Sequence, residues 1–396
     1  MKQERSGYPL VYLDSGATAQ KAQVVIDAVN DYLTTTYANP HRGAYLISQR
    51  ATDRYEAVRE KVRGFIGAEK LSEVIFVKSS TEALNLIARS FGETHLNKGD
   101  EIVISIAEHH ANLIPWQRAA MKTGAVLKYL YIDEEGALPD SELEKIGPRT
   151  KIVAVTHVSN VTGHVNDLKK ITSLAHSQGA VVVADGSQAV PHMRVDVQEL
   201  GVDFYTFTGH KIMSLTGAGI LYGREHILNE MEPFLLGGDM IEYVEEQSTT
   251  YNTLPWKFEA GTPLSEAVIS LGAAIDYIEN VGYDTIQAID RDLTGYLLEE
   301  LKKLDYIRVI GGTHAEGRSG IVTFQMEGVH SHDITQILDS KGICVRAGHH
   351  CAQPLARFEG AASTTRVSFW LYNTREDVDK LLKELKRVRR LMGIGA

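Results

Sequence analysis

Cysteine is scarce in this chain. Its 396 residues include only two, Cys344 and Cys351, and both lie near the C-terminal end. Two cysteines cannot form the disulfide framework of a small secreted domain, and they cannot supply the ligands of a four-thiolate zinc site. The two thiols are therefore free to have separate roles.

Long apolar runs and excess positive charge are also missing. No apolar stretch approaches the ~18 residues that a membrane-spanning helix requires, and the apolar patch in residues 1–14 is too short for a signal-peptide core. Lys and Arg total 41 against 51 Asp and Glu, a net charge of −10, which argues against nucleic acid or an anionic membrane as a partner. These absences predict a cytoplasmic protein.

What the chain does contain is ordinary globular composition, with 43% hydrophobic and 23% charged residues. A chain of this length exceeds what one hydrophobic core usually supports, so we expect two domains. From about residue 74, short β-branched runs alternate with amphipathic stretches. The predicted strands are Val74–Val77, Glu101–Ser105, Val126–Ile132, Ile152–Thr156, Val181–Ala184, Phe204–Thr208 and Gly219–Tyr222.

Helices are predicted between these strands, at Thr81–Phe91 and Pro115–Thr123. Several strands are continuously apolar, as expected where both faces of a sheet are covered, and the alternation predicts an α/β domain with a mostly parallel sheet. Because ligands bind at the carboxyl ends of strands in such sheets, the residues directly after the strands are candidates for a site.

The last part of the chain predicts a smaller α+β domain. Two long helical stretches, Glu266–Asn280 and Ile286–Leu304, lead into it. Its further predicted elements are strands at Ile307–Ile310, Ile321–Met326, Ile343–Arg346 and Arg366–Leu371, with helices at Asp333–Ser340 and Thr374–Met392. Basic residues toward the end of the final helix suit the helix dipole.

Hydroxyl side chains follow the strand Val74–Val77. Ser79, Ser80 and Thr81 bring hydroxyls and free backbone N–H groups to the start of a helix, which is a natural phosphate site. A simpler interpretation is that Ser80 only caps the helix. The chain has no Walker motif and no dinucleotide fingerprint, so phosphate binding alone selects no nucleotide.

Two charged residues follow successive buried strands. Asp185 comes after Val181–Ala184, and Lys211 comes after Phe204–Thr208. Asp185 alone could cap the next helix. A lysine in such a place is costly to bury unless it reacts or pairs, however. A desolvated lysine near a carboxylate and a phosphate loop is typical of a Schiff base to pyridoxal phosphate.

At these residues the chain resembles a known family: the SufS-type (group II) cysteine desulfurases, within the class V aminotransferase family of fold-type I pyridoxal-phosphate enzymes. The resemblance runs in order along nearly the whole chain. The matching stretches are Tyr12–Ser15, Asn39–Gly43, Ser80–Leu86, Glu108–Asn112, Pro115–Gln117, Thr156–Val161, Asp185–Val190, Thr208–Lys211, Phe258–Pro263, Arg346–Pro354 and Tyr372–Thr374.

The resemblance implies a large cofactor-binding domain with a mostly parallel seven-stranded sheet and a smaller α+β C-terminal domain. We expect the large domain at residues 15–275, and the small domain at 276–396 together with residues 1–14. The small domain would carry the loop with Cys351. The implied assembly is a homodimer.

The same resemblance implies roles around pyridoxal phosphate. Lys211 would hold the cofactor covalently and move the Cα proton, and Asp185 would keep the pyridine nitrogen protonated. Gln188 would donate to the ring hydroxyl. His109 would stack on the ring and assist proton transfer. A metal site at His109 and His110 is disfavoured, because adjacent side chains diverge and no further ligands lie at zinc spacing.

Further residues would bind the phosphate and the substrate. Thr81, Thr208 and His210 would hold the phosphate, with Ser80 as a neighbour, and Thr262 would reach it from the second subunit. The substrate carboxylate would be held by Asn160 and by a bidentate fork from Arg366. His41 and Arg346 are expected near the substrate.

The two cysteines differ in their setting. Cys344 alternates within a predicted strand, which indicates a buried small hydrophobe. Cys351 follows Gly348-His349-His350 in a loop, where imidazoles and arginines favour the thiolate. The resemblance implies that Cys351 attacks the sulfur of L-cysteine, keeps it as a persulfide and releases alanine, on a loop mobile enough to deliver sulfur to an acceptor.

The acceptor would be a SufU- or SufE-type protein of iron–sulfur cluster assembly. In relatives that use a zinc-containing SufU-type acceptor, a histidine matching His332 exchanges onto the zinc of the partner. The alternative is that Ser331 caps a helix and that His330 and His332 are merely solvated.

The sequence departs from the family pattern at two loops. The Gly-Pro pair that usually precedes Thr-Gly after the lysine is replaced here by Ser214-Leu215, and the usual Arg-Gly before the phosphate loop is replaced by Lys78-Ser79. Both changes remove residues with special backbone freedom or stiffness and so alter loop rigidity.

Other functions remain open at this level: a selenocysteine lyase, another lyase, epimerase or aminotransferase of the family, or a non-catalytic protein that kept the fold. Cys351 argues against most of the enzymes, because only sulfur transfer requires a thiol in that loop. Intact Lys211, Asp185 and His109 argue against the non-catalytic protein.

Overall fold

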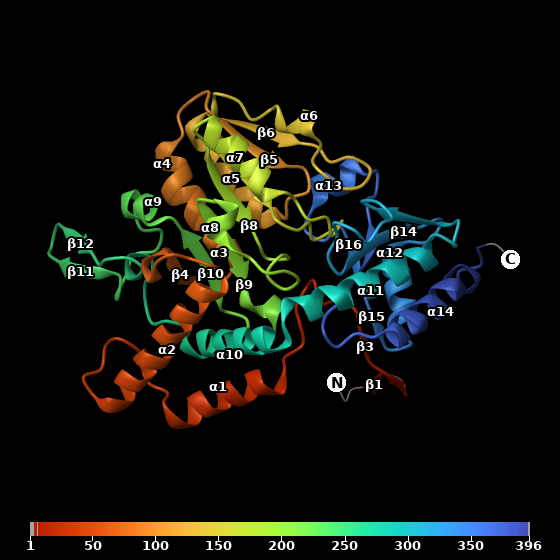
Figure 1. Cartoon of the computed structure of the whole chain (residues 1–396), viewed down its shortest axis with the longest axis horizontal. Helices are drawn as coiled ribbons and strands as arrows, with labels where there is room; N and C mark the ends of the chain where they lie inside the picture. Colours follow the sequence, from red (N-terminus) through yellow and green to blue (C-terminus); the bar gives the residue numbers. More distant parts are fainter. Residues whose placement is uncertain (1–3, 6, 395–396) are drawn as a thin grey trace.

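A seven-stranded sheet forms the centre of the larger part of the molecule (Figure 1). The structure is a computed structural model that describes residues 4, 5 and 7–394. In spatial order the strands are β4 (Val74–Val77), β10 (Gly219–Gly223), β9 (Phe204–Thr208), β8 (Val181–Asp185), β7 (Thr150–Thr156), β5 (Glu101–Ser105) and β6 (Val126–Leu130). Only β10 runs antiparallel to its neighbours in this sheet. The prediction of a mostly parallel sheet is confirmed.

Helices cover both faces of this sheet, which is why its strands are apolar on both sides. Successive side chains of a strand point to opposite faces. Accordingly, Val182 of β8 belongs to one core cluster and Val183 to the other. The first face is covered by α1 (Gln23–Thr35), α2 (Leu46–Phe65), α7 (Leu168–Ser177), α8 (Val197–Leu200) and α10 (Ser265–Val281). The second is covered by α3 (Ser80–Leu86), the π-helical turn η2 (Ile87–Gly92), α5 (Ile114–Thr123) and α9 (Glu225–Glu230).

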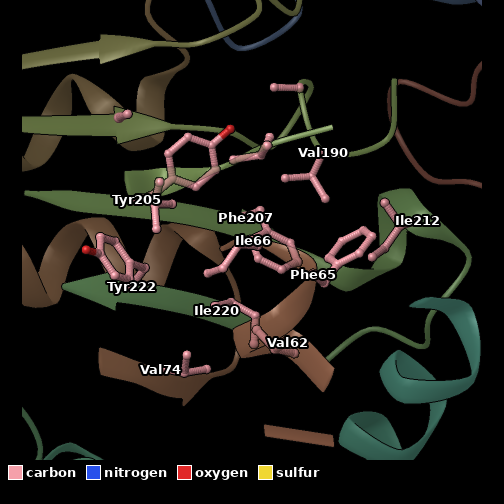
Figure 2. Packing of buried hydrophobic residues seen from close by; sticks show 14 of the residues in the cluster. Val62, Phe65, Ile66, Val74, Val190, Tyr205, Phe207, Ile212, Ile220 and Tyr222 are labelled. Carbon is pink, nitrogen blue, oxygen red and sulfur yellow. The ribbon is translucent and has the colours of Figure 1, made fainter. Parts of the chain in front are cut away.

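Figure 2 shows the first of these cores from close by. The rings of Tyr205, Phe207 and Tyr222 lie among aliphatic side chains from the end of α2 and from β10, and all three are fully buried or nearly so. Phe207 lies four residues before Lys211, so this packing fixes the strand that leads to the lysine.

The smaller part of the molecule is built on an antiparallel sheet of four strands. Its strands, in spatial order, are β13 (Ile307–Ile310), β14 (Ile321–Met326), β17 (Thr364–Ser368) and β16 (Arg346–Gly348). Its helices are α11 (Tyr283–Leu301), α12 (Ser331–Asp339), α13 (Gln353–Phe358) and α14 (Arg375–Leu391), and α14 carries Arg389 and Arg390 in its last turn as expected.

The N-terminal segment joins this smaller part, as Figure 1 shows where the red end of the chain runs beside the blue elements. β3 (Val11–Tyr12) pairs in parallel with β15 (Ile343–Cys344), and Val11 and Leu13 lie in the third core cluster with α11 and α14. The core cluster on the first face of the large sheet includes Ile286 of α11, which lies beyond the predicted domain boundary at residue 276. The domain division at residues 15 and 276 stays a prediction.

Several predicted elements differ from those observed. The helix predicted over Thr81–Phe91 is α3 followed by the wider turns of η2. The strand predicted at Ile343–Arg346 is two strands, because β15 pairs with β3 whereas β16 pairs with β17. The last strand, β17, begins and ends earlier than the predicted Arg366–Leu371.

Other elements were not predicted. They include α1, α2 and the hairpin of β11 (Ile241–Val244) and β12 (Thr249–Tyr251), which projects from the body of the molecule in Figure 1. The remaining short elements are β1 (Glu4–Arg5), β2 (Tyr8–Pro9), η1 (Leu71–Glu73), α4 (Glu93–His95), η3 (His110–Asn112), α6 (Asp140–Leu143), η4 (Gly209–Ile212) and η5 (Trp256–Phe258). Among the described residues, no helix is both long and apolar enough to cross a membrane.

Candidate active site

A cavity of about 440 Å³ opens where β7, β8 and β9 end. The last residue of each strand lines it: Thr156, Asp185 and Thr208. The small domain closes the cavity with Arg346, Cys351 and Arg366, and the N-terminal segment adds a further wall. The cavity therefore lies at the carboxyl ends of the parallel strands, where the sequence places its candidate site residues.

All but two of the predicted site residues line this cavity. They are Ser80, Thr81, His109, Asn160, Asp185, Gln188, Thr208, His210, Lys211, Arg346, Cys351 and Arg366. The two residues that do not line it are His41 and Thr262.

Asp185 is held rigidly at the end of β8. Its Oδ1 accepts a hydrogen bond from the backbone N–H of Ser187 at 3.0 Å, and its side chain is buried. The turn that follows requires Gly186, because a Cβ there would lie 2.2 Å from the Tyr205 hydroxyl oxygen. Asp185 does bond locally, but to a turn and not to the start of a helix. Its second oxygen therefore remains available to a group in the cavity.

Glu108 forms a second buried acid behind this wall. It accepts hydrogen bonds from the Ser105 hydroxyl at 2.5 Å, the Asn112 side chain at 2.7 Å and the Thr156 backbone at 2.9 Å. Burial raises the pKa of Glu108 to about 8 despite these donors, and the charge of Asp185 adds to the rise. These bonds fix the segment that presents His109.

Lys211 lies in the cavity on the turn η4 that follows β9. Burial lowers the pKa of Lys211 to about 8, and Arg366 also lowers it, whereas Asp185 and Cys351 raise it. About a tenth of the amine is therefore neutral at pH 7, far more than for an ordinary lysine, and the neutral amine is the form that reacts with a carbonyl group.

His109 is neutral and has a defined tautomer. Burial and the charge of Lys211 lower the pKa of His109 to about 4. The backbone N–H of Ala111 donates to Nδ1 at 3.1 Å, which places the ring proton on Nε2. The ring of His110 points elsewhere, with its centroid 6.3 Å from that of His109 and 5.6 Å from that of His349. Within the described part of the chain, no group of three His, Cys, Asp or Glu could hold a metal.

The hydroxyl loop before α3 differs from the simpler interpretation, in which Ser80 caps the helix. Ser79, not Ser80, caps the helix by accepting from the Glu82 backbone N–H at 3.3 Å. Ser80 instead bonds to the Ser187 hydroxyl at 2.7 Å and lines the cavity. The loop lies tightly against β10, since a Cβ at Gly219 would come within 2.5 Å of the Ser79 backbone.

Arg366 is a buried guanidinium held on two sides. Nη1 donates to the backbone oxygen of Asn160 at 2.9 Å, and Nη2 donates to Asp14 Oδ1 at 3.2 Å. Burial lowers the pKa of Arg366, and Asp14 opposes the shift. Arg346 lies at the mouth of the site, with Nη1 3.7 Å from Asp14 Oδ2 and about half of its side chain exposed.

The loop that carries Cys351 is held from the large domain. Asn160 Nδ2 donates to the His350 carbonyl at 2.7 Å, and the His110 backbone N–H donates to the Cys351 carbonyl at 2.7 Å. His350 and Cys351 have φ angles of 52° and 57°, a region that residues other than glycine seldom adopt. These contacts place Cys351 in the cavity wall, and the mobility expected of its loop stays a prediction.

Cys344 differs from its prediction in one respect. It lies in strand β15 as expected, but it is only half-buried, with burial raising the pKa of its thiol. It does not line the cavity.

The cavity wall contains three buried polar atoms that have no hydrogen-bond partner among the described residues: Gln188 Oε1, His350 Nδ1 and Arg366 Nε. Buried polar atoms are normally paired, so their concentration in one wall indicates a polar ligand. Gln188 Nε2 already donates to the Gly16 carbonyl at 2.8 Å, which fixes the amide.

Sequence reasoning missed some residues of the site. Besides Ser79, which the sequence already placed in the hydroxyl loop, the further lining residues are Gly16, Ala17, Thr18, Ala111, Thr156, Val158, Ser187, Thr216 and His350. His350 directly precedes Cys351 in the matching stretch Arg346–Pro354, and its position beside Cys351 could have indicated that it lines the site. Nothing local in the sequence places Gly16–Thr18 beside His210, whose backbone oxygen accepts from Thr18 Oγ1 at 3.1 Å.

His41 and Thr262 belong to a different region of the chain surface. The His41 Nε2 lies 3.3 Å from Glu56 Oε1, and the buried Arg59 bonds both Glu56 and Glu259. Glu259 precedes Thr262 by three residues. One ion-pair network thus fixes both segments, and the side chains of His41 and Thr262 lie outside the cavity of their own chain.

The region of His332 also differs from its simpler interpretation. His330 caps α12, with Nδ1 accepting from the His332 backbone N–H at 3.3 Å. Ser331 is buried and bonds to the Ser363 hydroxyl, so it is not the cap. His330 and His332 are exposed, with ring centroids 5.2 Å apart.

The aminotransferase class-V family profile matches residues 11–381, and the chain belongs to this family of fold-type I pyridoxal-phosphate enzymes. Relatives of similar length bear a more specific name. A "Probable cysteine desulfurase" of Halalkalibacterium halodurans is 48% identical over 394 residues, which cover 99% of this chain and 96% of the relative. One of Staphylococcus aureus is 43% identical over 390 residues, covering 98% and 94%.

Solved structures agree with this assignment. The apo structure of a cysteine desulfurase from Thermococcus onnurineus has a TM-score of 0.93 at 39% identity, covering 96% of this chain and 95% of that one. The cysteine desulfurase CsdA of Escherichia coli, in an S-sulfonic acid form, has a TM-score of 0.89 at 39% identity, covering 98% of each chain. The predicted fold class is confirmed.

Pyridoxal phosphate is the cofactor of the cysteine desulfurases in this family, and the cavity fits it. The cavity contains the amine of Lys211, the carboxylate of Asp185 and the hydroxyls of Ser80, Thr81 and Thr208. The unpaired Gln188 Oε1 and Arg366 Nε add polar atoms that a phosphorylated pyridine and an amino acid would pair.

Proposed function

We propose that this protein is a SufS-type cysteine desulfurase that converts L-cysteine to L-alanine and retains the sulfur as a persulfide on Cys351. The observation that carries the proposal is the position of Cys351 in the same cavity wall as Lys211, Asp185 and Arg366. A reaction that moves only amino groups or protons has no need of a thiol there.

Residues of this chain would hold pyridoxal phosphate at distinct points. Lys211 would bind it covalently, Asp185 would face its ring nitrogen, and Gln188 would lie beside its ring hydroxyl. Its phosphate would be held by Thr81, Thr208 and His210, next to Ser80. When bound, the cofactor supplies an electron sink that acidifies the Cα–H bond of an attached amino acid.

The substrate carboxylate would be held by Arg366, whose position is fixed by Asp14 and Asn160. The Nε–H has no partner in the described part of the chain, and together with Nη2–H it offers the side-on fork that a carboxylate accepts. The side-chain oxygen of Asn160 is available as well. Arg346 adds positive charge at the mouth of the cavity.

Proton transfer falls to Lys211 and His109. With a pKa of about 8, the Lys211 amine is able both to take and to return a proton near neutral pH. His109, neutral with its proton on Nε2, would donate a hydrogen bond to a neighbouring oxygen or stack on a ring without bringing a positive charge.

The sulfur step balances without an oxidant. The Cys351 thiolate attacks the sulfur of the substrate, so that a sulfur–sulfur bond forms and the carbon–sulfur bond breaks. The electron pair of that bond stays with the carbon fragment, which takes up a proton and leaves as alanine. In sum, two thiols become one persulfide and one C–H bond.

A homodimer would complete the site. Thr262 is exposed and lies outside the cavity of its own chain, as does His41, and one ion-pair network fixes both. Large apolar side chains such as Leu33, Tyr37 and Leu46 are exposed on the neighbouring α1–α2 region. A second copy of the chain would cover these side chains and bring Thr262 to the phosphate.

The sulfur would pass to an acceptor of iron–sulfur cluster assembly of the SufU or SufE type. The exposed His332 suits a zinc-containing acceptor, since an accessible imidazole is able to exchange onto zinc. In that case His332→Ala abolishes stimulation by a SufU-type protein and leaves basal alanine release intact, with His330→Ala as the matched control. Equal stimulation of His332→Ala and wild type would exclude this role.

The experiment that tests the function is an incubation of purified, PLP-loaded protein with L-cysteine in the presence of a thiol reductant. We expect alanine and sulfide to form in equal amounts, and Cys351→Ser to lose this activity while it keeps the absorbance of bound PLP. Alanine release by Cys351→Ser at the wild-type rate would refute the mechanism.

A further inference from the structure

The loop after Lys211 is held by a pair of buried serines. Ser214, two residues beyond η4, is completely buried, and so is Ser270 on α10. Their hydroxyl oxygens lie 2.7 Å apart. The backbone N–H of Leu215 also donates to the Ser270 hydroxyl, at 2.9 Å.

The direction of these bonds follows from counting hydrogens. Ser270 donates its only hydroxyl proton to the Ala267 carbonyl at 2.6 Å. Its oxygen is therefore an acceptor toward the loop. Leu215 N–H donates to it, and Ser214 Oγ–H has it as its nearest acceptor at 2.7 Å, ahead of the Leu215 and Ala267 carbonyls at 3.2 and 3.3 Å. If Ser270 lost its hydroxyl, Leu215 would keep a partly buried N–H without a partner.

The pair lies where the sequence departs from its family. The family resemblance implies Gly-Pro at these two positions, where this chain has Ser214-Leu215. A proline has no N–H to satisfy and stiffens the turn by its ring. Leu215 has a backbone N–H and no ring to fix its φ angle, and the Ser270 hydroxyl oxygen accepts the hydrogen bond of that N–H.

The turn is also under constraint at its other positions. Met213 has a φ of 72°, a value that residues other than glycine seldom adopt, and Ser214 N–H donates back to the Gly209 carbonyl at 3.0 Å. Thr216, just beyond the pair, lines the cavity. The turn thus presents Lys211 on one side of Ser214 and Thr216 on the other.

We propose that Ser214 and Ser270 are positioning residues that hold the turn of Lys211 and Thr216 in the geometry competent to bind pyridoxal phosphate, in place of the Gly-Pro stiffness of the family. The inference rests on the cofactor role proposed above for Lys211. It names a function for the departure itself: a side-chain hydrogen bond to α10 substitutes for a stiff backbone.

The test measures pyridoxal phosphate affinity and hydrogen exchange. PLP is titrated into the full-length protein after removal of bound cofactor, and exchange of segment 212–218 is followed in the PLP-loaded protein. In Ser270→Ala we expect the Kd for PLP to rise about tenfold, as loss of one buried hydrogen bond depopulates the competent turn, and the segment to exchange faster. Ser265→Ala, a buried serine at the start of the same helix, is the control and should leave both unchanged.

A rescue variant separates positioning from general damage. Ser214→Gly with Leu215→Pro, introduced into Ser270→Ala, removes the orphaned N–H and restores stiffness, so the Kd and the exchange should return toward wild type. Wild-type affinity and exchange in Ser270→Ala would overturn the proposal, and so would a rescue variant that binds PLP as weakly as Ser270→Ala.

Should Ser270→Ala fail to fold, Ser214→Ala is measured in the same way, since it removes a donor to the same oxygen and leaves Leu215 N–H paired. A smaller rise in the Kd for PLP is then expected, and an unchanged Kd would overturn the proposal. None of these readouts requires L-cysteine. Loss of alanine production with intact PLP binding would therefore contradict the proposed function and leave this inference standing.

Discussion

At the scale of single residues, the site is defined by charges that are buried and only partly satisfied. Arg366 is paired with Asp14 and with a backbone oxygen, yet its Nε remains without a partner among the described residues. Lys211 is buried in the same cavity and has a lowered pKa. Buried groups left in this state are costly, so the protein holds them for a ligand that completes them.

The guanidinium of Arg366 is predicted to act by its shape as well as its charge. In Arg366→Lys, kcat/KM for L-cysteine should fall about 10- to 100-fold, because the fork is lost although the charge is kept. Arg346→Lys is the matched control and should change it less, since that side chain is 53% exposed. Steady-state assays of alanine formation measure kcat/KM, and an equal decrease in the two variants would contradict a bidentate role for Arg366.

The amine of Lys211 gives a pH prediction with a definite sign. Only the neutral amine reacts with an aldehyde, so the rate at which the cofactor-free protein captures PLP should rise with pH through about 8 and then level off. Asp185 raises the pKa of Lys211, and Asp185→Ala should therefore move the midpoint to lower pH. Stopped-flow absorbance measures this rate. A midpoint near 10.5, the ordinary lysine value, would show that burial does not act as described.

At the scale of elements, the site depends on where strands end and how closely turns pass them. β7, β8 and β9 each deliver their last residue to the cavity. The hydroxyl loop before α3 reaches it only because β10 has no side chain at Gly219. The close approach of two backbones, not a side-chain contact, thus positions the hydroxyl loop.

Gly219→Ala is predicted to disturb that loop. The added Cβ would meet the Ser79 backbone at 2.5 Å, and backbone on both sides has to shift. We expect a loss of about 1–3 kcal/mol of unfolding free energy, as in other overpacked sites, together with weaker PLP binding. Gly147→Ala, where nothing lies within 4 Å, is the control. Denaturant unfolding curves that coincide for the two variants would rule out the close approach.

Much of the sheet could be predicted from the sequence, because its strands are apolar on both faces and read as continuous runs. β4, β5 and β9 of this sheet lie at their predicted residues, as do β13 and β14 of the smaller sheet. α2 was not predicted, although its buried Ala51, Tyr55, Val58 and Val62 have helical spacing, because charged residues separate them.

Features set by distant partners could not be predicted in this way. The split between β15 and β16 arises because the two strands pair with different neighbours. The cap at Ser79 instead of Ser80 depends on which residue first leaves extended backbone. Most of the site residues were found through motifs, whereas the bonds that hold Cys351 come from Asn160 and His110, far away in the chain.

At the scale of the whole molecule, the cavity lies where three parts of the chain meet. The large sheet supplies Asp185 and Lys211, the small domain supplies Cys351 and Arg366, and residues 16–18 supply a further wall. Asn160 ties the parts together, since it bonds both the cysteine loop and Arg366. Asn160, which lies beyond the end of β7, therefore fixes the cysteine loop and Arg366 against the large sheet.

Hybrid dimers test whether the site is shared between subunits. Thr262→Ala homodimers should bind PLP weakly, and Lys211→Ala homodimers should be inactive. A mixed dimer has one complete site, formed by the Lys211 of one subunit and the Thr262 of the other. Mixing the two variants under conditions of subunit exchange should therefore restore activity. Mixing that restores nothing, with exchange verified by mass, would contradict a trans role for Thr262.

A single turnover followed by mass spectrometry tests directly whether Cys351 receives the sulfur. PLP-loaded protein is mixed with less than one equivalent of L-cysteine without reductant, and peptides are mapped for an added sulfur atom. The account predicts one persulfide per alanine formed, on the peptide that contains Cys351 and not on the one that contains Cys344. Alanine formed with no added sulfur on Cys351, or with the sulfur on Cys344, would contradict it.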